Sequence, residues 1–270
     1  MNRPQGVILD LDGTICRGDQ LIPGAREAVE RLRRRNHPIV FVTNALESCA
    51  EHAAKLARLD IPASPDEVIN APLVLTRYLN RQMPGATVFA LGDLPLLEEL
   101  AANFRLSEDP DEIDVVVASF DPTFDYRKLT IAFQALRRGA RFLATNADAV
   151  CPTAEGELPD AAAVIGALEG CSKRRVELVA GKPSSLVVEV ALERLGRLAS
   201  ECLIVGDNLE SDILMGHRAG MTTVLVLTGV TRRADLAHAP VQPDYVLASI
   251  AEVGRLFGDD RPRRPGTSLS

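Results

Sequence analysis

Two carboxylates near the N-terminus, Asp10 and Asp12, are separated by one residue within the run VILDLDGT at residues 7–14. Their types and spacing are typical of a catalytic or metal-binding pair. The apolar residues 7–9 predict a buried strand that delivers Asp10 to its C-terminal end, where open α/β sheets bind ligands. Crowded carboxylates repel each other unless a cation lies between them, and Mg²⁺ is often held by one or two carboxylates. The pair therefore indicates a metal-assisted phosphoryl site, and the alternative is an ordinary acidic turn.

Three further segments place polar residues directly after an apolar stretch. They are Thr43-Asn44, Gly181-Lys182-Pro183-Ser184, and Gly206-Asp207-Asn208 followed by Ser211-Asp212. Phosphoryl transfer needs a nucleophile in line with the leaving group, donors for the phosphate oxygens, and positive charge. Each segment alone is also typical of a turn or a helix cap, but four in this order are hard to obtain by chance.

These residues divide the chemistry between them. Asp10 is the candidate nucleophile, and Asp12 is the candidate general acid and then general base. The Thr43 hydroxyl and the Asn44 backbone N–H are candidate phosphate donors, and Lys182 supplies a point charge.

The same segments predict a Mg²⁺ site. Asp10 and Asp207 are the main candidate ligands, with Asp12 as a third. Asp212 follows one helical turn after Asp207 and is placed to orient a water on the metal, with Asn208 also in the surroundings of the site.

Strands and helices alternate along the chain, which predicts right-handed βαβ units and an α/β fold with a parallel sheet. The predicted strands lie at residues 7–9, 38–42, around 68, 87–91, 113–119, 141–145, 176–180, 202–205, 222–227 and around 245. The predicted helices lie at residues 25–32, 50–59, 94–103, 128–138, 162–168, 186–195 and 211–219, and a loop with Pro152, Gly156 and Pro159 precedes one of them.

Composition excludes several classes of protein. A length of 270 residues with 46% hydrophobic residues suffices for one large domain or two small ones, and the net charge of −7 argues against nucleic acid or membrane partners. Five scattered cysteines without a Cys-x-x-Cys motif, and the lack of a signal-peptide pattern or an apolar run of ~20 residues, indicate a cytoplasmic protein. Residues 259–270 are rich in Arg, Pro, Gly and Ser, and are predicted to be disordered.

The four segments together resemble the motifs of the haloacid dehalogenase-like superfamily. Asp10-Leu11-Asp12-Gly13-Thr14 is similar to its first motif, Thr43 to its second, Lys182 to its third, and Gly206-Asp207 with Asp212 to its fourth. The segments at residues 120–129 and 142–148 resemble the NagD-like subgroup (class IIA), which includes 4-nitrophenyl phosphatases.

The resemblance implies a Rossmann-like parallel-sheet core from residues 1–80 and 181–258, with an α/β cap inserted at residues 81–180. It also implies a Mg²⁺-dependent phosphatase that hydrolyses a small phosphorylated metabolite through an aspartyl phosphate, and it leaves a homodimer open. The alternatives are a phosphotransferase or phosphomutase with the same intermediate and, in another class, a receiver-like regulatory phosphoprotein.

The sequence departs from the subgroup at two places. Ala45 and Leu46 stand where relatives often carry Asn and Ser, and Asp160-Ala161-Ala162 replaces a Gly-x-Gly opening of a helix. Asp160 is therefore expected either to cap that helix or to repel substrates with a second anionic group.

Overall fold

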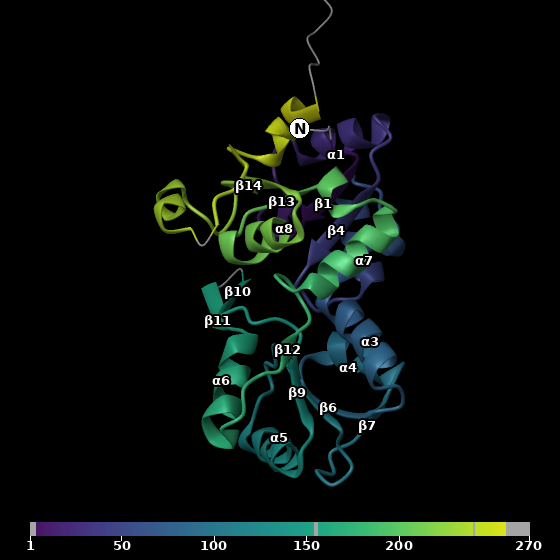
Figure 1. Cartoon of the computed structure of the whole chain (residues 1–270), viewed down its shortest axis with the longest axis vertical. Coiled ribbons are helices and arrows are strands. Elements are labelled where there is room, and N and C mark those ends of the chain that lie inside the picture. The colour runs from purple at the N-terminus through teal and green to yellow at the C-terminus, as the bar shows by residue number, and fades with distance from the viewer. Residues whose placement is uncertain (1–3, 154–155, 240, 258–270) are drawn as a thin grey trace, which may run out of the picture.

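The computed structural model describes residues 4–153, 156–239 and 241–257. Its two large β-sheets, each built of parallel strands, lie one above the other in Figure 1. The six-stranded sheet takes its strands from both ends of the described chain, and the five-stranded sheet takes its strands from the part between them. The predicted α/β fold with a Rossmann-like parallel sheet is confirmed. The domain boundaries remain a prediction, and the predicted disordered tail lies outside the described residues.

The six-stranded sheet has the order β15-β14-β13-β1-β4-β5, with every neighbouring pair parallel. Its strands are β1 (Gly6–Asp10), β4 (Ile39–Thr43), β5 (Val68–Asn70), β13 (Cys202–Gly206), β14 (Thr222–Val226) and β15 (Tyr245–Leu247). Alternate residues of a strand face opposite sides, so Val7 and Leu9 belong to one apolar core and Ile8 to another. Because helices cover both faces, β1 is apolar up to Asp10.

The helices on the two faces come from different parts of the chain. On the Val7 face lie α1 (Ala25–Arg34), α2 (Cys49–Arg58) and the 3₁₀ segment Ile250–Phe257. On the Ile8 face lie α3 (Ala71–Gln82), α7 (Ser185–Leu195) and α8 (Leu214–Ala219). Shorter 3₁₀ turns cover Pro65–Glu67, Ala199–Glu201 and Arg233–His238.

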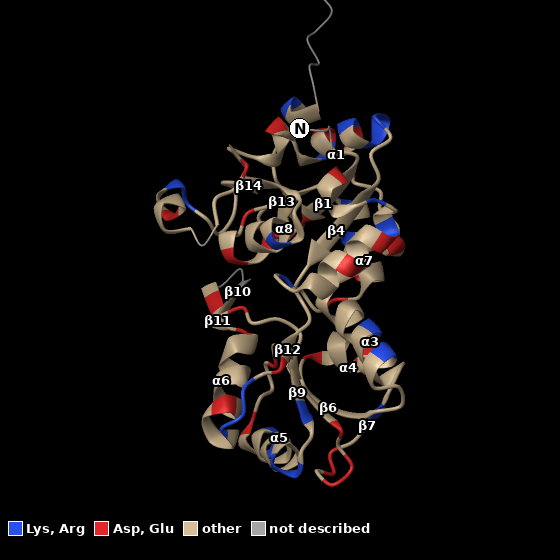
Figure 2. Cartoon of the chain, viewed as in Figure 1, with Lys and Arg blue, Asp and Glu red and all other residues tan. Residues whose placement is uncertain are grey.

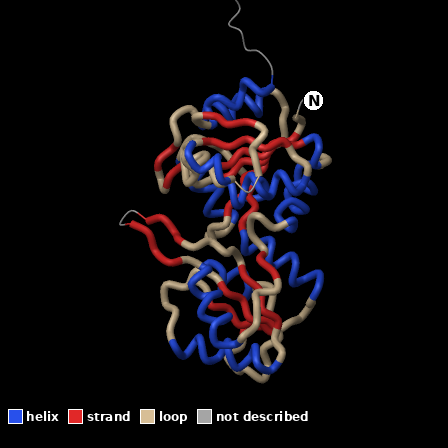
Figure 3. The backbone as a smooth tube through the Cα atoms, turned by 60° about the vertical axis from the view of Figure 1, so that its left-hand side comes forward, coloured by secondary structure: helices blue, strands red, loops and turns tan. Residues whose placement is uncertain are grey.

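The five-stranded sheet has the order β12-β9-β8-β6-β7 and is also parallel throughout. Its strands are β6 (Thr87–Leu91), β7 (Arg105–Leu106), β8 (Val115–Ala118), β9 (Arg141–Ala144) and β12 (Leu178–Val179). Helices α5 (Tyr126–Arg138) and α6 (Ala161–Ser172) pack on one face, and α4 (Leu94–Ala101) packs on the other. Figure 3 shows helices around two separate groups of strands.

Helix α3 joins the two sheets and was missed by the sequence analysis. Its Leu75 and Leu79 lie in the same apolar core as Val88 of β6 and Ile8 of β1. The Asn70 side chain caps its start by accepting the Leu73 N–H at 2.9 Å. The continuous apolar run at residues 71–75 does not by itself distinguish a helix from a buried strand.

Two other expectations are corrected. The predicted loop around Pro152, Gly156 and Pro159 is an antiparallel hairpin of β10 (Val150–Thr153) and β11 (Gly156–Pro159), which tolerates proline because each strand has an unpaired edge. The helix predicted at residues 211–219 begins with a π-helical turn over Leu209–Ile213. A second short hairpin pairs β2 (Cys16–Arg17) with β3 (Gln20–Leu21).

Acidic and basic residues alternate along the ribbon in Figure 2, and both kinds occur around each of the two large sheets. Within the described ranges, no helix has the length and apolar composition needed to cross a bilayer.

Candidate active site

Asp10 lies at the centre of the site, at the C-terminal end of the middle strand β1. Its side chain is buried, and Oδ1 accepts a hydrogen bond from Lys182 Nζ. Its Oδ2 is also buried but has no hydrogen-bond partner. A buried carboxylate oxygen without a partner is costly, so the arrangement is complete only when a ligand or cation contacts this atom.

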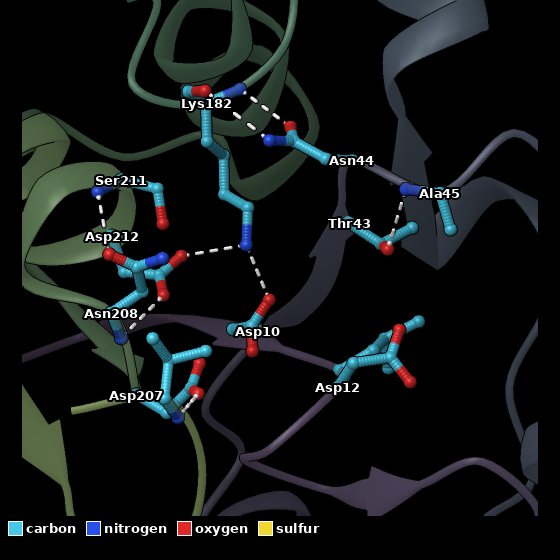
Figure 4. A network of polar contacts seen from close by, with 12 residues as sticks. Asp10, Asp12, Thr43, Asn44, Ala45, Lys182, Asp207, Asn208, Ser211 and Asp212 are labelled. Carbon is cyan, nitrogen blue, oxygen red and sulfur yellow. Dashed lines mark hydrogen bonds and ion pairs between the residues drawn. The ribbon is translucent and has the colours of Figure 1, made fainter. Parts of the chain in front are cut away.

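Two more carboxylates converge on Asp10 from the end of β13. Oxygens of Asp10, Asp207 and Asp212 lie within 4.8 Å of one another, and all three residues are buried. Lys182 Nζ also donates to Asp212 Oδ1 at 2.7 Å, so its ammonium pairs with two of the three carboxylates and leaves Asp207 without a cation among the described residues (Figure 4). This surplus of negative charge and the unpartnered Asp10 oxygen fit a hard divalent cation such as Mg²⁺.

The electrostatics of the cluster have clear causes. Burial raises the pKa of Asp10, and repulsion from Asp212 and Asp207 raises it further against the opposing attraction of Lys182. Burial and then the Asp212 charge raise the pKa of Asp207 to about 6. Burial alone would lower the pKa of Lys182, but attraction from Asp10 and Asp212 outweighs it and raises that pKa. The cluster therefore holds more negative charge than the protein alone compensates.

Close backbone packing fixes the Asp207 carboxylate. Its Oδ2 accepts the Val230 N–H at 2.5 Å, and a Cβ placed on Gly229 or Gly13 would lie 1.7 or 2.5 Å from the same oxygen. Gly13 also has a φ of 84°, which disfavours other residues. A side chain at either position would displace the carboxylate.

Asp12 lies apart from the acidic cluster. Its side chain is 53% exposed, and its nearest cation is Lys55 Nζ of α2, 3.7 Å from Oδ1. The structure therefore does not bring the Asp12 carboxylate to the other three acids, although the sequence predicts Asp12 as a candidate metal ligand. This position leaves Asp12 accessible for proton transfer, and Lys55 is a neighbour that sequence reasoning missed.

The other predicted residues surround the cluster. Thr43 ends β4, is buried, and its Oγ1 accepts the Ala45 N–H at 3.1 Å. Asn208 caps the π-helical turn by accepting the N–H groups of Glu210 at 2.8 Å and Ser211 at 3.3 Å. This cap orients the turn that carries Asp212.

Asn44 uses its side chain in a way that the sequence did not indicate. The amide binds the backbone of Lys182 and the carboxylate of Asp148, a residue from the loop after β9. Asp148 lies in the segment at residues 142–148, which resembles the NagD-like subgroup, but the sequence alone indicates no role for its side chain. Leu46 is buried in the apolar core.

Comparison with known proteins agrees with this geometry. Residues 7–103 match the family model described as haloacid dehalogenase-like hydrolase, and residues 179–253 match the one described as HAD-hydrolase-like. The chain is 40% identical over 255 residues to sugar-phosphatase AraL of Bacillus subtilis, covering 94% of this chain and 93% of that protein. The chain thus belongs to the haloacid dehalogenase-like hydrolases.

Solved structures narrow the subgroup. The p-nitrophenyl phosphatase from Archaeoglobus fulgidus superposes with a TM-score of 0.88 at 33% identity, covering 94% of this chain and 99% of that one. NagD from E. coli K-12 superposes with a TM-score of 0.84 at 28% identity, covering 93% and 98%. The predicted resemblance to NagD-like, class IIA phosphatases is confirmed.

Asp160 caps helix α6. Its Oδ1 accepts the Ala161 N–H at 2.5 Å, the residue is 9% exposed, and burial raises the pKa of its carboxyl. It also borders a cavity of about 330 Å³, which Phe120 and Leu158 line as well. The capping role predicted from the sequence is present.

Asp160→Asn is expected to keep the cap and to leave the relative kcat/KM values for neutral and anionic phosphomonoesters unchanged. Asp160→Ala is expected to lower the free energy of unfolding by about 1 kcal/mol, since it removes the cap. Steady-state assays on a substrate panel and denaturant unfolding measure both effects. A selective gain of about five-fold or more for anionic substrates in Asp160→Asn would instead show that this carboxylate repels the leaving group.

Proposed function

We propose that this chain is a Mg²⁺-dependent phosphatase that hydrolyses small phosphomonoesters through an aspartyl phosphate on Asp10. The observation that carries the proposal is the state of the Asp10 carboxylate, which is buried at the end of a strand. One of its oxygens accepts a hydrogen bond from the Lys182 ammonium, and the other has no hydrogen-bond partner. A group held in this way is oriented for attack and is surrounded by the charges that phosphoryl transfer needs.

The reaction proceeds in two displacements. In the first, an Asp10 oxygen forms a bond to phosphorus while the bond to the leaving oxygen breaks, and Asp12 gives that oxygen a proton. In the second, Asp12 takes a proton from a water that attacks phosphorus, so that inorganic phosphate leaves and Asp10 is restored. Two easier steps replace direct hydrolysis, whose acceleration by enzymes reaches ~10²¹.

The remaining residues supply charge and hydrogen bonds. Lys182 offsets negative charge on the phosphate and on Asp10, and Thr43 donates its hydroxyl to a phosphate oxygen. Asp10 and Asp207, with Asp212 beside them, would hold Mg²⁺, which supplies positive charge to the phosphate when bound. Asp12 is left to move protons because its carboxylate lies outside that cluster.

The names of the relatives indicate which class of substrate to expect. Those relatives include sugar-phosphatase AraL and 5'-nucleotidase YutF, both of Bacillus subtilis, so we propose a small phosphorylated metabolite as substrate. The five scattered cysteines, which form no Cys-x-x-Cys motif, support a cytoplasmic location.

The test is product analysis with sugar phosphates, nucleotides and 4-nitrophenyl phosphate in the presence of Mg²⁺. Equal amounts of inorganic phosphate and free alcohol are expected for the best substrates. Transfer of the phosphate to an added alcohol without release would identify a phosphotransferase instead. A stable phosphoprotein that does not turn over would identify a receiver-like protein.

A further inference from the structure

The Asn44 side chain connects three segments that are distant in the sequence. Its Oδ1 accepts the Lys182 N–H at 2.8 Å, and its Nδ2 donates to the Lys182 carbonyl at 3.3 Å (Figure 4). The same Nδ2 donates to Asp148 Oδ2 at 2.9 Å. Asn44 therefore holds the backbone of Lys182 on one side and the loop after β9 on the other.

The loop that carries Asp148 is itself well ordered by hydrogen bonds. Asn146 is buried, its Oδ1 accepts the Asp148 N–H at 3.0 Å, and its Nδ2 donates to the Asn44 carbonyl at 3.4 Å. The Asp148 carbonyl accepts the Ala162 N–H of α6 at 3.1 Å. Asp148 thus presents its carboxylate to Asn44 from a fixed position beside the five-stranded sheet.

The contact between Asn44 and Lys182 leaves no space for a side chain at Gly181. The Gly181 N–H donates to the Thr145 carbonyl at 2.6 Å, and a Cβ on Gly181 would lie 2.5 Å from Asn44 Oδ1 and 2.7 Å from that carbonyl. Tightly packed interiors transmit displacements. A shift of Asn44 would therefore move the Lys182 backbone, from which the ammonium reaches Asp10 and Asp212.

We propose that Asp148 is a positioning residue that, through Asn44, holds Lys182 in place between Asp10 and Asp212. The link joins the loop beside the five-stranded sheet to the reacting centre on the six-stranded sheet. The inference rests on the proposed function for its effect on turnover, but the position of Lys182 can be measured without turnover. A direct contact of the Asp148 charge with the leaving group is the competing interpretation.

Two variants separate these interpretations. Asp148→Ala removes the acceptor for Asn44, whereas Asp148→Asn keeps a neutral acceptor of about half the strength. We expect kcat/KM to fall about 10- to 100-fold in Asp148→Ala, because small misplacements of catalytic groups cost this much. The loss should be equal for aryl and alkyl phosphates, because Lys182 does not contact the leaving group. Asp148→Asn should stay within about five-fold of wild type.

Lysine acetylation followed by mass spectrometry reports the position of Lys182 independently of activity. Lys182 should be protected in the wild type and in Asp148→Asn, and its labelling should rise several-fold in Asp148→Ala. The control Asp111→Ala removes an exposed ion pair with Arg138 and should change neither labelling nor kcat/KM.

Each alternative outcome is decisive. Unchanged protection of Lys182 in Asp148→Ala would overturn the proposal, whatever the activity. Equal impairment of Asp148→Asn and Asp148→Ala, with a changed preference between aryl and alkyl phosphates, would assign Asp148 to the leaving group. A wild-type protein that releases no phosphate would refute the proposed function, while the labelling experiment would still decide the link.

Discussion

Asp10→Asn is expected to lower phosphate release from 4-nitrophenyl phosphate by about 10⁴-fold or more, as removal of a nucleophile does in other enzymes. The amide has nearly the same shape as the carboxylate, but it is not an anionic nucleophile and cannot form the aspartyl phosphate. The fold should persist, because the change removes a buried charge that burial and the neighbouring acids disfavour. Phosphate release and thermal unfolding measure the two expectations.

Asp66→Asn is a suitable control for the Asp10 variant. Asp66 is exposed in the short 3₁₀ turn Pro65–Glu67, so the same chemical change should leave activity and stability near those of the wild type. An Asp10→Asn protein that is folded and retains activity within ten-fold of wild type would contradict the assignment of the nucleophile.

Removal of divalent metal is expected to produce the second large effect. Excess EDTA should abolish activity, Mg²⁺ should restore it, and Ca²⁺ should support it poorly, since Ca²⁺ takes more ligands at longer distances than Mg²⁺. The acidic cluster of Asp10, Asp207 and Asp212 provides only oxygen donors for such an ion.

Binding of the metal should also stabilise the folded protein. Mg²⁺ at 100 times its dissociation constant adds about 2.7 kcal/mol, so the melting temperature should rise with Mg²⁺ concentration. Asp207→Asn should weaken that dependence, because it removes a carboxylate from the cluster. Full activity in excess EDTA, together with a melting temperature that does not respond to Mg²⁺, would contradict a metal site.

The sequence predicted those parts of the fold that depend on local pattern. Strands such as β1 and β6 are continuous apolar runs because both faces of each sheet are covered. Helix α3 was missed because its continuous apolar run at residues 71–75 does not distinguish a helix from a strand, and the hairpin of β10 and β11 was missed because its prolines indicated a loop. Tertiary packing therefore decided the structure where local pattern was weak.

The functional site also combines features that local sequence pattern predicts with features that only tertiary packing decides. Asp10 and Asp207 come together because β1 and β13 are neighbouring parallel strands whose C-terminal ends lie at one edge of the six-stranded sheet. Lys182 reaches them from the segment between β12 of the other sheet and α7. The contact between Asn44 and Asp148 joins residues 104 positions apart, and no local signal indicates it. The separation of Asp12 from the acidic cluster likewise depends on the path of the chain after β1 and on Lys55 of α2.

The covalent intermediate is tested most directly by trapping it. Asp12→Asn protein mixed with 4-nitrophenyl phosphate and Mg²⁺ and then quenched in acid should carry one phosphoryl group, because 4-nitrophenolate leaves without a proton while the second step lacks its base. Peptide mass mapping should place that group on Asp10, and it should be absent in protein that also carries Asp10→Asn. Release of 4-nitrophenol and phosphate in equal amounts, without a phosphorylated peptide at any time, would contradict the two-step mechanism.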